Sequence, residues 1–153
     1  PVQHSIYLYD WVGKPWKTQA RVREVMEKFY SCTPDGYCGD EDNGQTSSWY
    51  VFSAMGFYPV CPASCEYALG SPLFDEVTVH LPSGKDIVIA SSGNCGESVY
   101  VKDVLLNGKK HTRNYLTHKE LTEGAKISFT MSRTAETDRG TAPGDRPYSY
   151  TVD

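Results

Sequence analysis

The sequence predicts an α+β protein in which N-terminal helices are followed by a small antiparallel β-sheet or sandwich unit. Two changes of pattern support this order. Up to residue 62, apolar side chains recur at helical spacing, whereas after it short runs alternate between apolar and polar residues. From residue 133 onward the chain is polar, rich in Pro, Gly and Thr, and without a hydrophobic period. We therefore expect three regions, 1–62, 63–132 and 133–153, of which the last is a flexible polar tail.

Three helical segments are expected in the first region. Residues 4–12 read as the end of a helix that Gly13 closes. A second helix begins near Pro15 and continues to residue 30, with one apolar face. A third covers residues 46–55 and ends at Gly56. Apolar side chains surround this helix almost completely: Trp49, Tyr50, Val51, Phe52 and Met55. We therefore expect the helix to be buried on every side, which needs more helices than this chain supplies.

The β unit is predicted from alternating runs and turn residues. Residues 77–81 and 86–90 alternate, and the segment 82–85 between them has the composition of a hairpin turn. Residues 99–101 and 104–106 are two further strands, and Asn107-Gly108 turns the chain back so that residues 109–116 pair across it. Residues 117–120 form a helical turn before a last strand at 125–131. We find no chemistry in this unit and expect a structural role.

Between the second and third helices lies a glycine-rich loop, residues 34–45, with three consecutive carboxylates, Asp40, Glu41 and Asp42. Adjacent negative charges repel, and ordered glycines lose much backbone entropy, so this loop is costly unless it has a function. In an extended segment Asp40 and Asp42 point to one side and Glu41 to the other. The helix that follows favours ionised carboxylates, which suit a general base or a hard cation. The alternative to a functional site is an acidic surface turn, in which Asn43-Gly44 forms the tight corner.

Other site classes fit less well. The loop fails the EF-hand pattern, because Gln45 stands where the glycine is needed and Val51 where the closing glutamate is needed. The five cysteines are spaced poorly for zinc, although Cys32–Cys38 and Cys61–Cys65 could each form a local disulfide. So many cysteines in a chain of 153 residues indicate an oxidising compartment. The net charge of −4 argues against nucleic acid, and no apolar run approaches the ~20 residues of a membrane span.

The run GYCGDEDNGQTSSWYVFSAMGFYPVCP, residues 36–62, resembles the C-terminal signature of glycoside hydrolase family 92, the calcium-dependent α-mannosidases. The resemblance extends through YLY at 7–9, GKPWKTQ at 13–19, YALGSPLF at 67–74 and LNG at 106–108, and covers roughly residues 1–132. It implies that the helices of residues 1–62 close an (α/α)6 barrel. The chain would then be a C-terminal fragment, with an N-terminal β domain and the earlier barrel helices as its partners.

The resemblance also implies an activity: inverting, calcium-dependent exo-hydrolysis of α-mannosidic linkages, chiefly α-1,2, in mannose-containing oligosaccharides such as N-glycans. It places the general base at Asp42, with Asp40 beside it, and substrate contacts at His4 and Glu41. Asp40, Asp42 and Gln45 are the candidate ligands or second-layer groups of calcium. A secreted or periplasmic location is expected.

The general acid must lie elsewhere. Acid and base of an inverting glycosidase stand roughly 6.5–9.5 Å apart, a separation that two residues of one loop do not easily provide. The family acid is a glutamate of an earlier segment, and the glutamate of an Asn-Glu-Pro stretch would precede Pro1, so the fragment alone is expected to be inactive. The alternatives are a non-catalytic carbohydrate-binding module and a calcium-stabilised structural domain. Trp11, Trp16 and Trp49 could be sugar platforms, but core packing suits Trp16 and Trp49 better.

Overall fold

The computed structural model describes residues 3–150, so the expectations that concern Pro1 and residues 151–153 lie outside the described residues. Three α-helices and three 3-10 turns are assigned: η1 (Ser5–Asp10), α1 (Pro15–Phe29), α2 (Gln45–Met55), η2 (Pro62–Ser64), α3 (His118–Thr122) and η3 (Pro143–Asp145). The strands are β1 (Phe57–Tyr58), β2 (Glu66–Leu69), β3 (Glu76–His80), β4 (Asp86–Ser92), β5 (Tyr100–Leu106), β6 (Lys109–Lys110), β7 (Tyr115–Thr117) and β8 (Ala125–Ser132). The α+β class and the helices-first order are confirmed.

Local sequence signals set the helix boundaries. Pro15 occupies the first turn of α1, where its missing N–H costs nothing, and the chain becomes extended at Tyr30. At the end of α2, Gly56 adopts a left-handed conformation with φ of 101° and donates its N–H to Ser53 O at 3.0 Å. The predicted helix end at 4–12 is the 3-10 turn η1, followed by left-handed Gly13. The predicted turn at 117–120 is α3, which begins with a capping box between Thr117 and Glu120.

The strands form two sheets, one in the order β1-β2-β7 and a larger one in the order β3-β4-β8-β5-β6. The three-stranded sheet is antiparallel throughout. In the larger sheet, β4 and β8 are parallel, so the expectation of a purely antiparallel unit is wrong at this pairing. The physical reason is the long crossover between them, which runs through β5, β6, β7 and α3 before β8 starts.

Two further strand expectations need correction. The segments 99–101 and 104–106 are one strand, β5, interrupted by a register shift between Val101 and Asp103 where it pairs with β8. Across the Asn107-Gly108 turn only β6 pairs back, whereas β7 leaves this hairpin and pairs with β2 in the other sheet. Both corrections follow from tertiary pairing, which alternation along one segment does not report.

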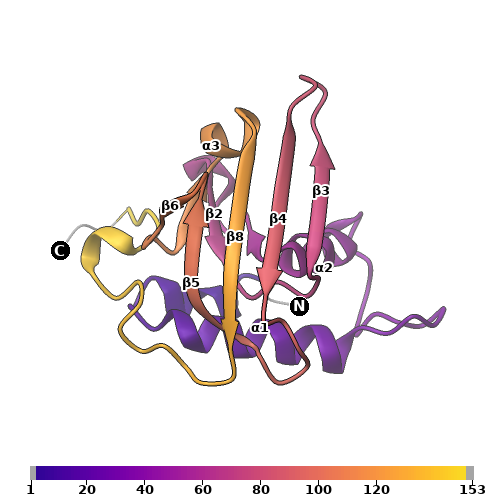
Figure 1. Ribbon diagram of the computed structural model, residues 1–153. Coiled ribbons are helices and arrows are strands. Elements are labelled where there is room, and N and C mark those ends of the chain that lie inside the picture. The colour runs from indigo at the N-terminus through magenta and orange to yellow at the C-terminus, as the bar shows by residue number, and fades with distance from the viewer. Residues whose placement is uncertain (1–2, 151–153) are drawn as a thin grey trace.

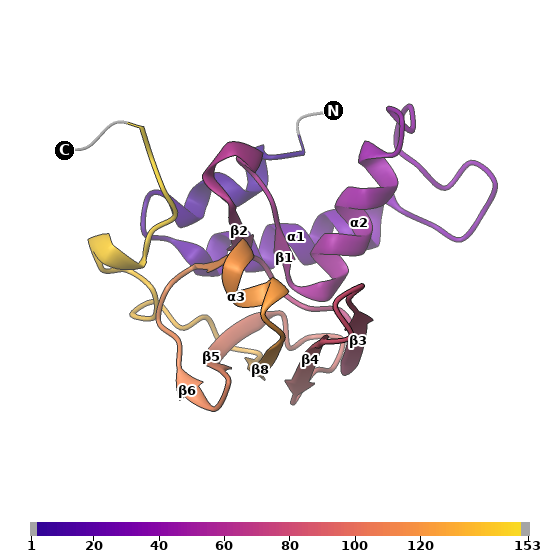
Figure 2. The same ribbon diagram turned by 90° about the horizontal axis from the view of Figure 1, so that it is seen from above.

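Helices α1 and α2 lie on one side of the larger sheet (Figures 1 and 2), and α1 contacts it directly, since Gln19 Oε1 accepts from Val101 N–H of β5 at 3.0 Å. One core fills the space between the two sheets, where β4, β5 and β8 turn alternate residues inward, including Ile89, Val104, Ile127 and Phe129. A second core joins η1, α1, α2 and β2 around Tyr7, Val22 and Trp49. The Tyr7 hydroxyl is hydrogen-bonded to Ser53 Oγ at 2.9 Å, which satisfies both buried groups. Trp49 and Ser53 thus fix α2, and with it the end of the acidic loop, against this second core.

Helix α2 is not covered on every side within the described residues. Trp49 is buried, in agreement with the expected core role, but Val51 on the same helix remains 54% exposed. Phe29 at the end of α1 and Val12 after η1 are also exposed. Among residues 3–150, no helix combines the length and apolar character needed to cross a lipid bilayer.

The segment after β8 was expected to be a flexible tail, but residues of it between 139 and 148 are hydrogen-bonded to the fold. Arg139 donates to the carbonyl of His111 at 3.0 Å and to Oδ1 of buried Asn114 at 3.2 Å. The Trp11 indole donates to the carbonyl of Tyr148 at 2.8 Å, and Tyr148 N–H donates to Glu66 at 2.7 Å. Polar contacts rather than an apolar face anchor this segment, and for that reason hydrophobic period could not reveal it.

Candidate active site

The acidic loop leaves the end of α1 and returns at the start of α2. An antiparallel bridge joins Tyr30 and Tyr37 at its base, and Ser31 N–H donates to Gly36 O at 3.0 Å. A β-carbon at Gly36 would lie 2.0 Å from the backbone carbonyl oxygen of Ser31, so this turn requires glycine. The first half of the loop therefore has a defined path, and it delivers Gly39 and the three carboxylates next to α2.

The second half of the loop turns sharply into the helix. Asp42, Asn43 and Gly44 are all left-handed, with φ of 56°, 57° and 94°. Asp and Asn tolerate this conformation better than other side chains, and Gly44 adopts it without steric cost. Gln45 N–H donates to Asp42 O at 3.2 Å, and Thr46 N–H donates to Glu41 O at 3.1 Å. The predicted corner at Asn43-Gly44 is thus present, and it carries Asp42 as well.

The buried Thr46 supplies a second connection between the loop and the helix. Its hydroxyl donates to the backbone carbonyl of Asp40 at 2.9 Å, while its own carbonyl accepts from the Tyr30 hydroxyl at 3.2 Å. Tyr30 in turn stacks on Trp49, with ring centroids 5.5 Å apart and planes at 13°. The backbone at Asp40 is therefore linked through Thr46 and Tyr30 to the helical core.

The three carboxylates have different surroundings. Glu41 accepts hydrogen bonds at both oxygens, from Gly44 N–H at Oε2 and from Ser47 N–H and Oγ at Oε1. The Ser47 hydroxyl is the main cause that holds the pKa of Glu41 below its usual value. Asp40 and Asp42 are exposed, and within residues 3–150 neither carboxylate has a hydrogen-bond or ion-pair partner. Glu41 therefore differs from both aspartates in its contacts, but the extended alternation expected for the loop is wrong at Asp42, which is left-handed with φ of 56°.

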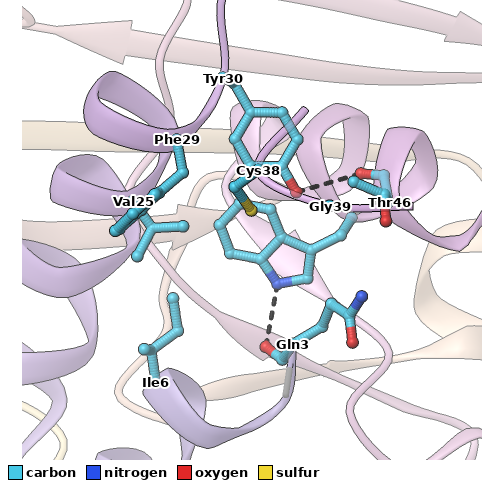
Figure 3. Close-up of a pocket in the computed structure, with 9 residues that line it drawn as sticks. Gln3, Ile6, Val25, Phe29, Tyr30, Cys38, Gly39 and Thr46 are labelled. Atoms are coloured by element: carbon cyan, nitrogen blue, oxygen red, sulfur yellow. Dashed lines mark hydrogen bonds between the residues drawn. The ribbon is translucent and has the colours of Figure 1, made fainter. Parts of the chain in front are cut away.

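Beside the loop, a hollow of about 330 Å³ lies between α1 and α2. Figure 3 shows Val25 and Phe29 of α1, Tyr30, Cys38 and Gly39 around it. At one side stands Gln3, whose carbonyl accepts from the Trp49 indole at 3.0 Å and whose Oε1 accepts from Gln45 Nε2 at 3.3 Å. Gln3 Nε2 is buried and has no hydrogen-bond partner among the described residues. The hollow is thus lined mainly by apolar side chains, with Gln3 at its edge.

Gln3 was not predicted as a site residue, although it precedes His4, which was. His4 is exposed at the start of η1 and makes no cap hydrogen bond with its side chain. Gln45, expected as a calcium ligand or second-layer group, instead contacts Gln3 and so links the N-terminal segment to α2. Through the Gln3–Gln45 contact, the structure brings the segment next to His4 close to the end of the acidic loop. The sugar contact expected of His4 stays a prediction.

A second hollow of about 500 Å³ lies on the other side of Tyr30, beside Ser47. Three tyrosines, Tyr30, Tyr37 and Tyr50, form much of its wall. Tyr37 meets Tyr30 edge-on with centroids 6.0 Å apart and is 43% exposed. The acidic loop is therefore flanked by two hollows that share Tyr30.

The expected calcium site is tested by the donor set itself. Carboxylate and amide oxygens suit calcium, which takes 6–8 oxygen ligands. Among residues 3–150, however, no three His, Cys, Asp or Glu side chains gather as a metal-binding group. Asp40 and Asp42 have the right chemistry but do not make a complete site.

All five cysteines of the chain are exposed free thiols in the structure, so neither local disulfide is formed there.

Comparison with known proteins identifies the family. The sequence model described as the glycosyl hydrolase family 92 catalytic domain matches residues 1–133. The chain belongs to glycosyl hydrolase family 92. Within this family, the structure of the inverting mannosidase BT2199 from Bacteroides thetaiotaomicron VPI-5482 is 59% identical, covers 98% of this chain and has a TM-score of 0.92.

Two further relatives agree with the family 92 assignment. The family 92 α-mannosidase BT3965 from Bacteroides thetaiotaomicron is 37% identical over 98% of this chain, with a TM-score of 0.95. A protein named as an uncharacterized secreted glycosidase from Arthroderma benhamiae is 30% identical over 148 residues, or 95% of this chain. The family 92 chain described here spans only 19–20% of the length of these three relatives.

Proposed function

We propose that this family 92 segment carries the general-base side of the active site of an inverting exo-α-mannosidase, with Asp42 as the base and Asp40 beside it. The observation that carries the proposal is the difference among the three carboxylates: Glu41 is fully engaged, while Asp40 and Asp42 stand free on a fixed loop. The hollow beside the loop, about 330 Å³, is at the small end of the range for small-molecule sites.

The chemistry assigned to Asp42 is proton removal. In an inverting reaction the base takes a proton from the water that attacks the anomeric carbon, while an acid on the opposite side protonates the leaving oxygen. Asp42 is suited to this task because its carboxylate is accessible and unpaired within the described residues. Asp40 adds a second negative charge that favours the oxocarbenium-like transition state. The acid is assigned to a glutamate outside this chain, so the segment alone does not catalyse.

The substrate is proposed to be the terminal α-mannose of an oligosaccharide such as an N-glycan, with α-1,2 linkages first. The printed name of BT2199, an inverting mannosidase, supports the sugar and the stereochemistry, since the two chains are 59% identical. Gln3, which lines the hollow, and exposed His4 are the residues that we assign to sugar hydroxyls. Secretion or export to the periplasm is proposed because the Arthroderma benhamiae relative is named a secreted glycosidase.

We also propose that α1 and α2 belong to an (α/α)6 barrel completed by earlier helices of a longer chain that has an N-terminal β domain. The exposed apolar side chains Val12, Phe29 and Val51 support this arrangement, because they leave the helical layer uncovered. Calcium dependence is part of the proposal at the level of the family. The described residues contribute at most part of such a site, so the remaining ligands would come from outside this chain.

Substitution in the longest natural chain that contains this segment tests the assignment. Asp42→Asn is expected to lower kcat on α-1,2-mannobiose by about 10²–10⁴-fold, the usual range for losing a general base, with binding retained. Asp138→Asn, at an exposed carboxylate in the C-terminal segment, is the matched control and should leave kcat unchanged. A carbohydrate-binding module would show little effect of Asp42→Asn. A structural calcium loop would lose melting temperature and calcium affinity, with activity intact, and either result would overturn the proposal.

A further inference from the structure

Glu41 was expected to contact substrate, but its position indicates a different role. Its side chain reaches across the corner formed by Asp42, Asn43 and Gly44 and accepts hydrogen bonds on the far side. One carboxylate therefore spans the residues that include the proposed base. Among the described residues, the Ser47 hydroxyl also donates to Gly44 O at 3.3 Å, whereas Thr46 bonds to the backbone before the corner, at Asp40.

The corner needs such a support. Asp42 and Asn43 are both left-handed without being glycine, a conformation that costs most L-residues roughly 1–2 kcal/mol and that Asp and Asn adopt at a lower cost. Asp42 and Asn43 are exposed, and a β-carbon at Gly44 would meet open space. The Glu41 contacts use donors that α2 leaves unpaired at its N-terminus, which include the N–H of Ser47. The same interactions that cap the helix therefore hold Asp42 in its strained conformation.

We propose that Glu41 is a positioning residue for the base, an inference that rests on the assignment of Asp42 in the proposed function. The ionised carboxylate fixes the path from Asp40 to Gly44, so that the Asp42 side chain stays exposed with its oxygens free. Glu41 acts through Gly44 and Ser47 and does not touch the sugar. Because a misplacement of about 1 Å can cost roughly 100-fold in rate, the support matters even without contact to the substrate.

The amide substitution is informative because it changes the donor pattern with little change of shape. In Glu41→Gln, the amide group turns an N–H toward one of two donors, Gly44 N–H or the Ser47 pair, and cannot satisfy both. Glu41→Asp retains the charge and both acceptors on a shorter stem, so it should restore part of the loss. Ser47→Ala removes the hydroxyl, which contacts both Glu41 and Gly44 O, and keeps the hydrogen bond from Ser47 N–H to Glu41.

The experiment measures kcat and KM of these variants on α-1,2-mannobiose in the longest natural chain that contains the segment. We expect Glu41→Gln to lower kcat by roughly 100-fold with KM changed less than about twofold, and Ser47→Ala to lower it by roughly tenfold. The double variant should be no worse than Glu41→Gln, because Ser47 and Glu41 act as one unit. Glu123→Gln, a carboxylate on the distant α3 end, is the charge-matched control and should match the wild type.

Distinct results overturn the inference. If Glu41→Gln raises KM and leaves kcat unchanged, Glu41 is a sugar ligand. The same conclusion follows if Ser47→Ala leaves kcat unchanged while Glu41→Gln lowers it. Additive losses in the double variant would also contradict a shared path. If Glu41→Gln fails to fold, the kcat of Ser47→Ala alone decides, since that variant keeps the charge and the backbone contact. Failure of the proposed function itself is recognised separately, because Asp42→Asn would then retain activity whatever Glu41 does.

Discussion

Gly140 offers a quantitative test of how the C-terminal segment is held. It has φ of 68°, and a β-carbon there would lie 2.1 Å from Oδ1 of Asn114, a residue with no exposed surface. Asn114 Nδ2 donates to Gly140 O at 2.6 Å, and its Oδ1 accepts from Arg139 at 3.2 Å. Gly140→Ala must therefore displace the Asn114 side chain and break both bonds in a buried place.

The expected cost combines two effects. A left-handed alanine costs roughly 1–2 kcal/mol, and each buried polar group left unpaired costs about 1–3 kcal/mol. With the two polar groups of the Asn114 side chain left unpaired, we expect Gly140→Ala to destabilise the contact between the C-terminal segment and the fold by about 3–8 kcal/mol. Two glycines separate the effects: Gly108, with φ of 77° and open space around it, carries the backbone cost alone, while Gly144, with open space and no positive φ, carries neither.

Native-state hydrogen exchange of the longest natural chain containing the segment is the suitable assay, because it reports local opening. The amide of Asn114 donates to Asp145 O at 2.7 Å and should exchange much faster in Gly140→Ala. Gly108→Ala should leave this amide unchanged while loosening the β5–β6 turn, and Gly144→Ala should resemble the wild type. If Gly140→Ala protects the Asn114 amide as well as Gly144→Ala does, the segment is not anchored as described.

Two more predictions concern the ends of helical segments. Burial, partly offset by Thr18 and Arg139, raises the pKa of Asp10 well above 3.8, so the folded protein binds this proton more tightly than the unfolded chain. The free energy of unfolding of the protein should therefore fall as pH rises from about 3.8 toward the raised pKa of Asp10 in the folded state. Melting temperatures of Asp10→Asn, measured over the same pH range, should lack this decrease. Parallel pH curves would contradict it. Thr117→Ala should destabilise α3 by about 1 kcal/mol, as loss of a capping box does, seen as faster exchange at Glu120; unchanged exchange would refute it.

The parts of the fold that could be predicted are those with local causes. Helix α1 follows from its apolar stripe and Pro15, α2 ends at Gly56, and the β3–β4 hairpin follows from alternation around a turn with left-handed Gly84. The parallel pairing of β4 with β8 and the transfer of β7 to β2 join segments far apart in sequence, which no local pattern reports. The anchor at Arg139 was missed because it uses polar groups without a period.

The site shows the same division. Three consecutive carboxylates before a helix indicated the loop. The extended alternation expected there does not hold, because Asp42 is left-handed, and Glu41 differs from the aspartates through its contacts with Gly44 and Ser47. The capping role of Glu41 had no recognised signal, because a standard capping box pairs a glutamate inside the helix with a residue before it, and here the glutamate precedes the helix. Gln3 could not be found from its type alone, since its importance comes from the Trp49 and Gln45 contacts that folding creates.

The central claim is that this family 92 segment supplies the base of an inverting α-mannosidase. The most direct measurement follows the anomeric protons by NMR while the longest natural chain that contains the segment acts on α-1,2-mannobiose, with calcium and with a chelator. We predict that β-mannose appears first, that the chelator suppresses it, and that Asp42→Asn abolishes it. If α-mannose appears first, or if no mannose is released under any condition, the inverting mannosidase and the role of Asp42 are contradicted.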